Sequence, residues 1–488
     1  MTESSAAIGT EPQVAATARK LALPALTAMV VGSMVGAGVF SLPRNFGHAT
    51  GVFGALIAWA IAGCGMLMLA FVFQILAVRK PHLDSGMYAY AKAGFGEFPG
   101  FLSAFGYWAS ACVGNATYWI LIKSTLGPLI PGFGEGNTLL AIAVSTIGVW
   151  AFAYLILRGV EDAAIINQIV TVAKLLPILT FVVILAVTLK ADVFSANFYG
   201  GDKSFGGVVS QVRATMLVTV FVFLGVEGAS VYSNHAQRRS HVGRATVMGL
   251  LSVLALFASV TILSYGALPR AELGELRQPS MGAVLESVVG HWGSVFISAG
   301  LIVSVLGAYL AWTLMAAEVL FTAARDKDMP RFLRQENRNG APSAALVLSA
   351  GLVTAVLLFS MLSDDAFTFT LELTSALSLI PYLLAAAYAL KLVLTRETYT
   401  GPAAALRNKH LVISGLATIY TAFLLWAAGL HYLLLSCVVY APGVILFVRT
   451  RQEQRRKLFT SAEGLLMVIL CAGAIAGIVG LSTGGITI

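Results

Sequence analysis

Two glycine-marked segments interrupt apolar runs of the chain, and they contain the residues whose types and spacing could do chemistry. The first is GSMVGAGVF, at residues 32–40, and the second is FLGVEGAS, at residues 223–230. At membrane depth a glycine-rich interruption of a helix is tolerated only where the freed N–H and C=O groups face protein, water or a ligand. The backbone of both segments is therefore a candidate binding surface.

Broken helices offer two kinds of unpaired backbone group. The N-terminus of a half-helix presents N–H groups and a positive dipole end, which suit a carboxylate. Exposed carbonyls and half-helix C-termini suit an ammonium group. Because an amino acid carries both charges on one carbon, two facing breaks could hold its carboxylate and α-amine. Interrupted segments at corresponding positions in two halves of a chain are typical of inverted-repeat transporters with a midplane site.

Five charged residues lie within or at the ends of apolar runs: Lys174, Arg213, Glu227, Glu318 and Glu372. Charge is costly inside a membrane, so such residues usually face a polar interior and serve a pathway. The alternative is a paired structural charge or a misplaced span boundary. Arg213 lies so near the start of its run that we expect it at the interface. Glu227 is the most informative, because it lies inside the second glycine-marked segment.

The elements that must position these residues are membrane-spanning helices. Hydrophobic residues make up 58% of the chain, charged residues 11%, and the mean hydropathy is +0.84. Runs long enough to span a bilayer recur from Leu21 to the C-terminus, which predicts one all-α polytopic membrane domain. Residues 1–20 lack the order of a signal peptide and are predicted to be a cytoplasmic tail. Thirteen spans are predicted, at residues 21–48, 51–78, 99–123, 137–157, 164–189, 211–234, 246–268, 293–323, 343–362, 366–391, 409–429, 430–449 and 461–482.

Lysine and arginine predict the orientation, because short cytoplasmic loops carry the excess. With the N-terminus inside, 23 of the 31 basic residues fall in inside segments and six in outside segments. This predicts a multi-pass protein of the cell (inner) membrane with a cytoplasmic N-terminus. The net charge of +8 is then a topology signal, and nucleic-acid binding is not expected. The four cysteines show no CxxC spacing and are interpreted as buried small apolar residues, so no metal, disulfide or cofactor is expected.

Three motifs resemble the amino acid-polyamine-organocation (APC) superfamily: GSMVGAGVFSLP in the first span, SGMYAY at residues 85–90 and FLGVEGASV in the sixth. Over roughly residues 20–450 the chain is similar to the basic amino acid/polyamine antiporters, and most similar to the arginine/ornithine antiporters. The resemblance implies a LeuT-like 5+5 inverted repeat with broken helices 1 and 6 and about 12–13 transmembrane helices. It divides the chain into a transporter domain at residues 21–450, with repeats at about 21–189 and 211–391 and two further helices, and a basic linker with an extra helix at 451–488.

The resemblance also implies contacts with the substrate's backbone. Met34, Gly36, Ala37 and Gly38 would contact its carboxylate and amine. Phe221 stands where arginine/agmatine exchangers carry a stacking tryptophan. A phenylalanine makes a weaker cation–π contact than a tryptophan, so selectivity for a guanidinium is expected to differ here.

Further contacts are expected from other spans. By resemblance Asn115 is a polar contact in the third span, and Trp312 packs on the substrate's aliphatic stem. In the tenth span Glu372 and Ser375 are an i,i+3 pair on one helix face, and we hypothesise that they contact the distal amine of a basic substrate. The alternative for an aromatic residue such as Trp312 is packing or an interface anchor.

Four residues are predicted to gate or couple transport. By resemblance Tyr107 is an aromatic gate, and Glu227 is an acidic residue beside the substrate that we interpret as a charge switch. Lys174 stands where sodium-coupled relatives bind their ion, and its ammonium would replace the ion, which predicts sodium-independent transport; the alternative is a lysine that snorkels to the inner face. Glu318, nearly two turns beyond Trp312, is expected to attract cations in an inner vestibule.

The predicted function is secondary active exchange of cationic amino acids, arginine for ornithine, by alternating access around a midplane site. The alternative is a proton-coupled importer of lysine or another amino acid on the same fold. An enzyme is not expected, because the seven histidines fall mainly in loops or near span ends. The predicted partners are arginine, ornithine, lysine and membrane lipid, and the oligomeric state stays open between a monomer and a homodimer.

Overall fold

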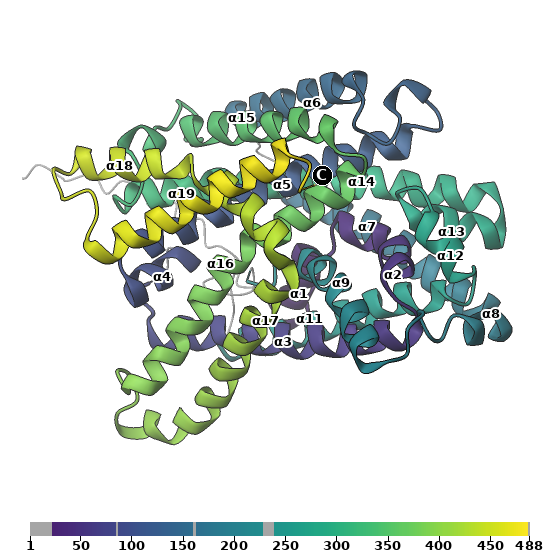
Figure 1. The fold of residues 1–488 in the computed structure, drawn as a ribbon, viewed down its shortest axis with the longest axis horizontal. Helices are drawn as coiled ribbons and strands as arrows, with labels where there is room; N and C mark the ends of the chain where they lie inside the picture. Colours follow the sequence, from purple (N-terminus) through teal and green to yellow (C-terminus); the bar gives the residue numbers. More distant parts are fainter. Residues whose placement is uncertain (1–21, 84–85, 160–162, 228–238, 487–488) are drawn as a thin grey trace, which may run out of the picture.

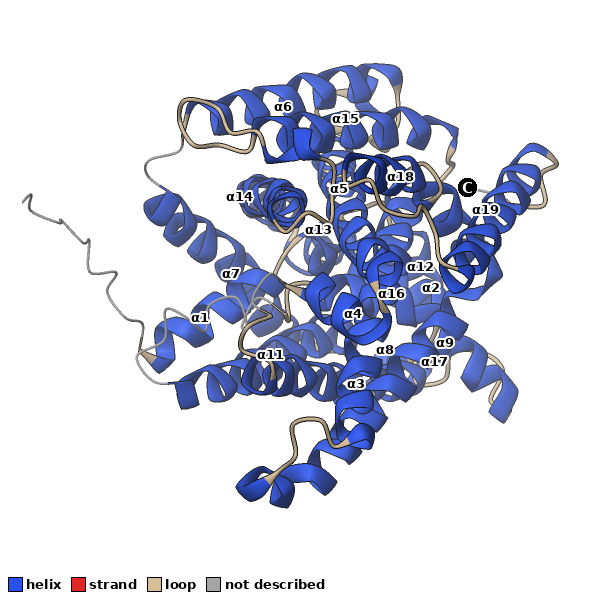
Figure 2. Ribbon diagram, turned by 90° about the vertical axis from the view of Figure 1, so that its left-hand side faces the viewer, coloured by secondary structure: helices blue, strands red, loops and turns tan. Residues whose placement is uncertain are grey.

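The computed structural model describes residues 22–83, 86–159, 163–227 and 239–486, and these residues form helices and no extended strand (Figure 1; Figure 2). The predicted tail at residues 1–20 lies outside them, as do Ser85 of the SGMYAY motif and Gly228, Ala229 and Ser230 of the second glycine-marked segment. The α-helices are α1 (Leu23–Met34), α2 (Leu42–Ala49), α3 (Val52–Arg79), α4 (Met87–Phe95), α5 (Glu97–Leu126), α6 (Leu139–Arg158), α7 (Ala163–Thr188), α8 (Ala191–Ala196), α9 (Phe205–Phe223), α11 (Arg239–Ser264), α12 (Arg270–Glu275), α13 (Ser280–Val289), α14 (His291–Arg325), α15 (Ser343–Phe359), α16 (Ala366–Thr395), α17 (Arg407–Tyr440), α18 (Gly443–Glu453) and α19 (Ser461–Ser482).

Within the described residues, nine helices are long and apolar enough to cross a membrane, and ten if the bent pair at residues 26–49 is one span. This confirms the all-α, polytopic fold class. Each of the thirteen predicted spans contains a helix, although the number that cross a bilayer stays a prediction. Helix α5 is not among these nine, because it is less apolar than they are. It is a central helix, in which every residue from Phe98 to Thr125 except Leu102 is buried, so its polar side chains face protein.

Several boundaries differ from the prediction. Helix α9 begins at Phe205 and ends at Phe223, earlier than the predicted span at residues 211–234. The predicted division between residues 429 and 430 is a single non-helical position, Gly429, inside α17. A second interruption follows at Ala441 and Pro442, and α18 then runs on to Glu453, into the predicted basic linker. Glycine and proline cause both interruptions, since Gly429 has a φ of 71° and proline cannot continue a helix.

The cysteine interpretation is wrong at one position. Cys112 is buried in α5, and Cys437 and Cys471 are half-buried, but Cys64 is exposed. The reason is its place on α3, whose residues with exposed side chains, including Leu56, lie on the face turned away from the protein. The four cysteines are free.

The helices form layers around α5, α14 and α16. In both views α6 and α15 run side by side along one edge of the molecule, and α3 and α11 lie on the opposite side, where the connected ends of α16 and α17 project beyond them (Figure 1; Figure 2). Helix α5 packs against α14, α15 and α16 between these edges, while α17 packs against α3, α16 and α19. The two candidate segments therefore lie in the middle of the protein, where α1 and α9 meet the central helices.

One end of the molecule gathers the loops that the basic residues predict to be cytoplasmic. Lys80, after α3, pairs with Glu397, after α16. Lys92 of α4 pairs with Asp328, after α14, at 2.5 Å. Burial raises the pKa of the Asp328 carboxyl above its usual value, and the hydrogen bond from Lys92 opposes that rise. The predicted inside loops therefore contact one another.

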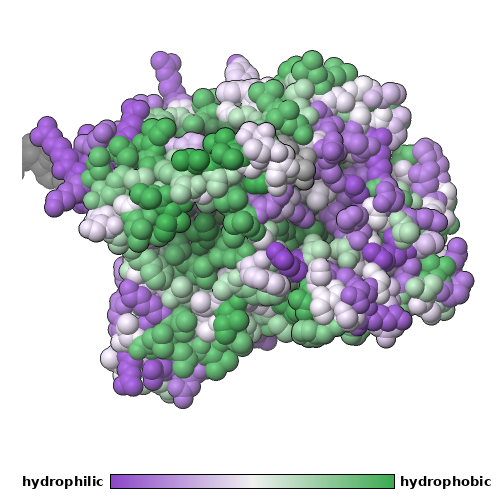
Figure 3. Space-filling view, viewed as in Figure 1, coloured by the Kyte–Doolittle hydropathy of each residue, from purple (hydrophilic) through white to green (hydrophobic). Residues whose placement is uncertain are grey.

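The predicted outside loops gather at the other end. Arg44 of α2 pairs with Asp365, before α16, at 2.8 Å, and Arg277 pairs with Glu135 at 3.0 Å. Figure 3 shows hydrophilic residues at both ends of the long axis and hydrophobic residues over much of the surface between them. The loops sort into the two predicted sets, while the choice of which end faces the cytoplasm stays a prediction.

Candidate functional site

The first glycine-marked segment is a break between two helices. Helix α1 ends at Met34, a 3-10 helix begins at Ala37 and leads into α2, and the two parts are bent by 49°. Gly36 lies between them with φ −127° and ψ −148°. Gly38 allows a close approach to α9, since a Cβ on Gly38 would lie 2.6 Å from Val222 Cγ1. The break thus exposes the last carbonyls of α1 and the first N–H groups of the next half-helix.

Lys174 of α7 binds the carbonyl side of this break. Its side chain is buried, with 3% of its surface exposed, and its Nζ donates a hydrogen bond to the carbonyl oxygen of Gly32. A cation at a helix C-terminus is favourable, because the freed carbonyls carry the negative end of the helix dipole. The contact places the ammonium at the first break, and its role in ion replacement stays a prediction.

The second glycine-marked segment is also a break, and it touches the first. Helix α9 ends at Phe223, and Gly225 follows in the left-handed region at φ 101°. Ser33 Oγ of α1 lies 3.0 Å from the Gly225 carbonyl oxygen, across 192 residues of sequence. A Cβ on Gly225 would lie only 2.5 Å from the Ser33 carbonyl oxygen. The two breaks therefore meet face to face.

Glu227 is buried at the second break among hydrogen-bond donors. Its Oε1 accepts from the Tyr107 hydroxyl of α5 at 2.6 Å. Its Oε2 accepts from the Tyr382 hydroxyl of α16 at 2.9 Å and from the Gly225 N–H at 3.2 Å. The Tyr107 ring lies 6.4 Å from the Trp312 ring, centroid to centroid. A buried carboxylate needs such donors, and here they link Glu227 to the residues around the pocket.

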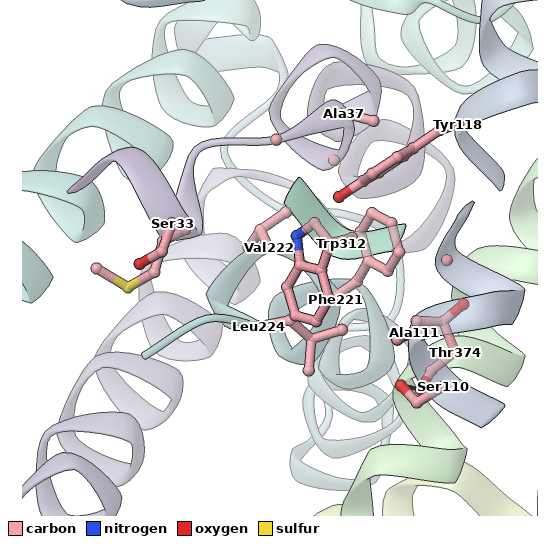
Figure 4. A pocket seen from close by; sticks show the side chains of 14 residues that line it. Ser33, Ala37, Ser110, Ala111, Tyr118, Phe221, Val222, Leu224, Trp312 and Thr374 are labelled. Atoms are coloured by element: carbon pink, nitrogen blue, oxygen red, sulfur yellow. Dashed lines mark hydrogen bonds between the residues drawn. The ribbon is translucent and has the colours of Figure 1, made fainter. Parts of the chain in front are cut away.

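A pocket opens between the breaks (Figure 4). Six of the predicted substrate contacts line it: Met34, Gly36, Ala37, Gly38, Phe221 and Trp312. The remaining lining residues are Ser33, Ser110, Ala111, Gly114, Tyr118, Val222, Leu224 and Thr374. None of the described residues that line the pocket is charged, so a cationic side chain there would meet aromatic faces and backbone or hydroxyl dipoles.

The structure does not bring Asn115 or Ser375 into the pocket lining. Asn115 is buried, and its Nδ2 donates to Thr313 Oγ1 at 3.1 Å. Ser375 Oγ donates to the Leu217 carbonyl oxygen at 2.7 Å, and so joins α16 to α9. Asn115 follows the lining residue Gly114 and therefore points about 100° away around α5. Each of the two side chains thus joins two neighbouring helices.

The two remaining acids lie outside the pocket. Glu318 is exposed on α14, where it accepts a hydrogen bond from Thr322 Oγ1 at 3.0 Å. Glu372 is half-buried on α16 and lies beside Tyr432 of α17. Their predicted roles toward a cationic substrate stay predictions.

Sequence reasoning missed the pocket face of α5. Ser110, Ala111, Gly114 and Tyr118 recur at steps of one, three and four residues, which is the spacing of one helix face. Ser110 Oγ donates to the Thr374 carbonyl oxygen of α16 at 2.7 Å. This periodicity, counted from Tyr107, would have identified the face without a structure.

Tyr382 was also missed. It lies seven residues after Ser375, two turns along the same side of α16, and its side chain is fully buried. The sequence marks Glu227 as a charge that needs partners, but nothing local to Glu227 indicates a tyrosine 155 residues away.

Together these features define a class: an all-α, multi-pass membrane protein with a central uncharged pocket at two facing helix breaks. Within this class the chain belongs to the amino acid permease family, whose family model matches residues 21–479. The resemblance stated from the three motifs is thereby confirmed.

Three relatives are similar over nearly their whole length. An arginine/ornithine antiporter of Pseudomonas aeruginosa is 49% identical over 477 residues, covering 96% of this chain and 99% of the relative. An L-lysine transport protein of Corynebacterium glutamicum is 39% identical over 489 residues, covering 97% of each. An arginine/ornithine antiporter of Latilactobacillus sakei is 38% identical over 465 residues, covering 94% and 97%.

Proposed function

We propose that this protein is a secondary active transporter that exchanges arginine for ornithine by alternating access. The observation that carries the proposal is the uncharged pocket between the two helix breaks, lined by Gly36, Ala37 and Gly38 of the first break and by Phe221 and Trp312. The glycines supply backbone N–H groups for a carboxylate, and the aromatic rings supply faces for an aliphatic cation. Two relatives that are named arginine/ornithine antiporters support this substrate pair.

Transport, and not catalysis, fits the polar groups around the pocket. Glu227 and Tyr107 form a buried hydrogen-bonded pair beside Trp312, where a change in the charge of Glu227 would act on a cationic substrate through a short distance. We propose that Glu227 is the charge switch, that Tyr107 is the gate which it holds, and that Lys174 makes exchange independent of sodium.

The second candidate function is proton-coupled import of lysine. The L-lysine transport protein among the relatives favours it, and the pocket has no feature that selects a guanidinium over an ammonium. A buried carboxylate such as Glu227 could then serve as the proton carrier.

We further propose that the protein lies in the cell (inner) membrane with the end that holds Lys80, Lys92 and Arg451 facing the cytoplasm, because that end carries the excess of basic residues. In this arrangement residues 1–20 form a cytoplasmic tail, residues 21–450 the transporter domain, and residues 451–488 a linker with an extra helix. Membrane lipid surrounds it, and a homodimer is a candidate assembly.

Counterflow in proteoliposomes tests these proposals. Purified protein is reconstituted with internal ornithine, arginine, lysine or no amino acid, and uptake of labelled arginine is measured with and without a pH gradient. An antiporter takes up arginine only against an internal exchange partner. An importer takes up labelled lysine into empty vesicles when the outside is acidic. That result would reject exchange and support import as the function.

A further inference from the structure

Tyr118 is a pocket residue to which neither the motifs nor the family resemblance assigned a role. It lies on α5, and 7% of its surface is exposed. Figure 4 shows its hydroxyl pointing into the pocket beside Trp312, on the side of the half-helix that begins at Ala37. Within the described part of the chain, its hydroxyl has no hydrogen-bond partner. A buried hydroxyl without a partner is unfavourable unless a ligand or water completes it.

The neighbour of this hydroxyl is the first helix break. A Cβ built on Gly36 would lie 3.2 Å from the Tyr118 hydroxyl oxygen, so the hydroxyl lies close to the backbone of the break, and a side chain at this position would crowd it. The next half-helix starts at Ala37, and its first N–H groups have no partner within the helix. The hydroxyl and these N–H groups are therefore donors that face the same space.

Converging donors select an anionic acceptor. We propose that the Tyr118 hydroxyl donates a hydrogen bond to the α-carboxylate of the bound amino acid, together with the N–H groups of residues 36–38. The inference rests on the proposed function, since it assumes that the pocket takes an amino acid, and it adds which protein group recognises the carboxylate.

Other groups of the site are less suited to the carboxylate. The ammonium of Lys174 is bound to the Gly32 carbonyl, and the hydroxyl of Ser33 is bound to the Val30 and Gly225 carbonyls. Phe221 and Trp312 offer aromatic faces, which attract cations and not anions. Tyr118 is thus the side chain that separates amino acids from amines of the same length.

The test compares a substrate with its decarboxylated form. Competition by unlabelled arginine and by agmatine, which lacks the carboxylate, is measured against labelled arginine for the wild type and for Tyr118→Phe. Loss of one hydrogen bond to a charged group lowers the affinity for arginine roughly ten- to hundredfold, while the affinity for agmatine stays as in the wild type. The matched control is Tyr440→Phe, because the Tyr440 hydroxyl donates to the Leu377 carbonyl oxygen outside the pocket. It should leave both affinities unchanged.

Two results would overturn the inference: an unchanged affinity for arginine in Tyr118→Phe, or an equal loss for arginine and agmatine. Failure of the proposed function is separate. If the wild type prefers another amino acid, such as lysine, the same comparison is made with that amino acid and its own decarboxylated amine, and the hydroxyl must still discriminate between them. If no amino acid binds, both the function and the inference are wrong.

Discussion

The two helix breaks satisfy their backbones with opposite charges. At the first break the freed carbonyl end of α1 is bound by the ammonium of Lys174 through the Gly32 carbonyl. At the second break the Gly225 N–H is bound by the carboxylate of Glu227. The ammonium of Lys174 lies where the dipole of α1 favours a cation, and the carboxylate of Glu227 accepts from an N–H group that follows the end of α9. Two glycine-marked breaks therefore need different partners. A break with unpaired carbonyl groups needs a cation, and a break with unpaired N–H groups needs an anion.

The difference also separates their tasks. In the described part of the second break, polar groups bind other groups of the protein. The Gly225 carbonyl oxygen accepts from Ser33, and the Glu227 carboxylate accepts from Tyr107 and Tyr382. The first break has its carbonyl side bound by Lys174, and it turns its N–H side toward the pocket. We infer that the first break binds the substrate, while the second transmits a change of charge to the surrounding helices.

The largest expected effect comes from adding a methyl group where the breaks meet. Gly225→Ala places a Cβ at a positive φ and 2.5 Å from the Ser33 carbonyl oxygen. Backbone strain and overpacking together cost roughly 2–6 kcal/mol, so we expect little folded protein and no exchange. Size-exclusion chromatography and thermal unfolding in detergent check this.

A matched control for Gly225→Ala is Gly415→Ala in α17, where a Cβ has no neighbour within 4 Å. Alanine favours a helix over glycine by up to about 1 kcal/mol, so this variant should be as stable as the wild type or more so. If Gly225→Ala folds with normal stability and transports at the normal rate, the breaks do not meet as closely as described.

The second effect concerns the cation of the first break. Lys174→Met removes the donor to the Gly32 carbonyl, and a buried unsatisfied carbonyl costs about 1–3 kcal/mol. If this cost falls on the binding-competent state, arginine exchange drops roughly 10- to 100-fold. Lys190→Met changes an exposed lysine that lies after α7, at the start of α8, and should exchange normally. Wild-type exchange should not respond to sodium. A sodium requirement in the wild type would contradict the role of Lys174.

The sequence predicts the breaks but not their partners. Glycine within an apolar run and a charge inside a span are local signals, so both breaks, Lys174 and Glu227 can be found by inspection. The partners depend on tertiary packing: Gly32 lies 142 residues from Lys174, and Tyr382 lies 155 residues from Glu227.

The third span shows how far a resemblance reaches. The motif match selects Asn115, which turns away from the pocket toward Thr313. The helical period selects Gly114 and Tyr118, which line the pocket. A one-residue difference along a helix changes the facing direction by about 100°, so the positions of side chains in α5 follow more reliably from the period than from residue type.

The next effect tests the anion of the second break. In Glu227→Gln the amide oxygen can accept from Tyr382 and the Gly225 N–H while the NH₂ group donates to the Tyr107 hydroxyl, so the variant removes the negative charge and replaces charge-assisted hydrogen bonds by neutral ones. We expect arginine exchange to slow roughly tenfold and its pH profile to flatten. Tyr382→Phe keeps the carboxylate with Tyr107 and Gly225, so it should slow exchange less and retain the pH profile. An unchanged rate and pH profile in Glu227→Gln would refute the charge switch.

The smallest effect is expected at a third break, which provides a reference for the other two. Gly429 interrupts α17 at φ 71°, and a Cβ there would lie 2.9 Å from Arg213 Nη2. Arg213 Nε donates to the Ala427 carbonyl oxygen at 3.3 Å, so a cation binds the freed carbonyls here, as Lys174 does at the first break. None of these residues lines the pocket. At φ 71° and ψ 171° the backbone of Gly429 is in a region open essentially to glycine, so Gly429→Ala should lower stability by roughly 1–3 kcal/mol and leave the affinity for arginine unchanged.

The control for this third break is Gly351→Ala in α15, where a Cβ meets no atom within 4 Å and stability should hold or rise. Thermal unfolding measures the stability of both variants, and counterflow measures their affinity for arginine. A tenfold loss of affinity in Gly429→Ala would show that α17 is coupled to the pocket. Cations would then take part in the transport cycle at two helix breaks, Lys174 at the first and Arg213 at the third. Whether a break affects substrate binding would depend on its coupling to the pocket through α9, and not on its distance from the pocket.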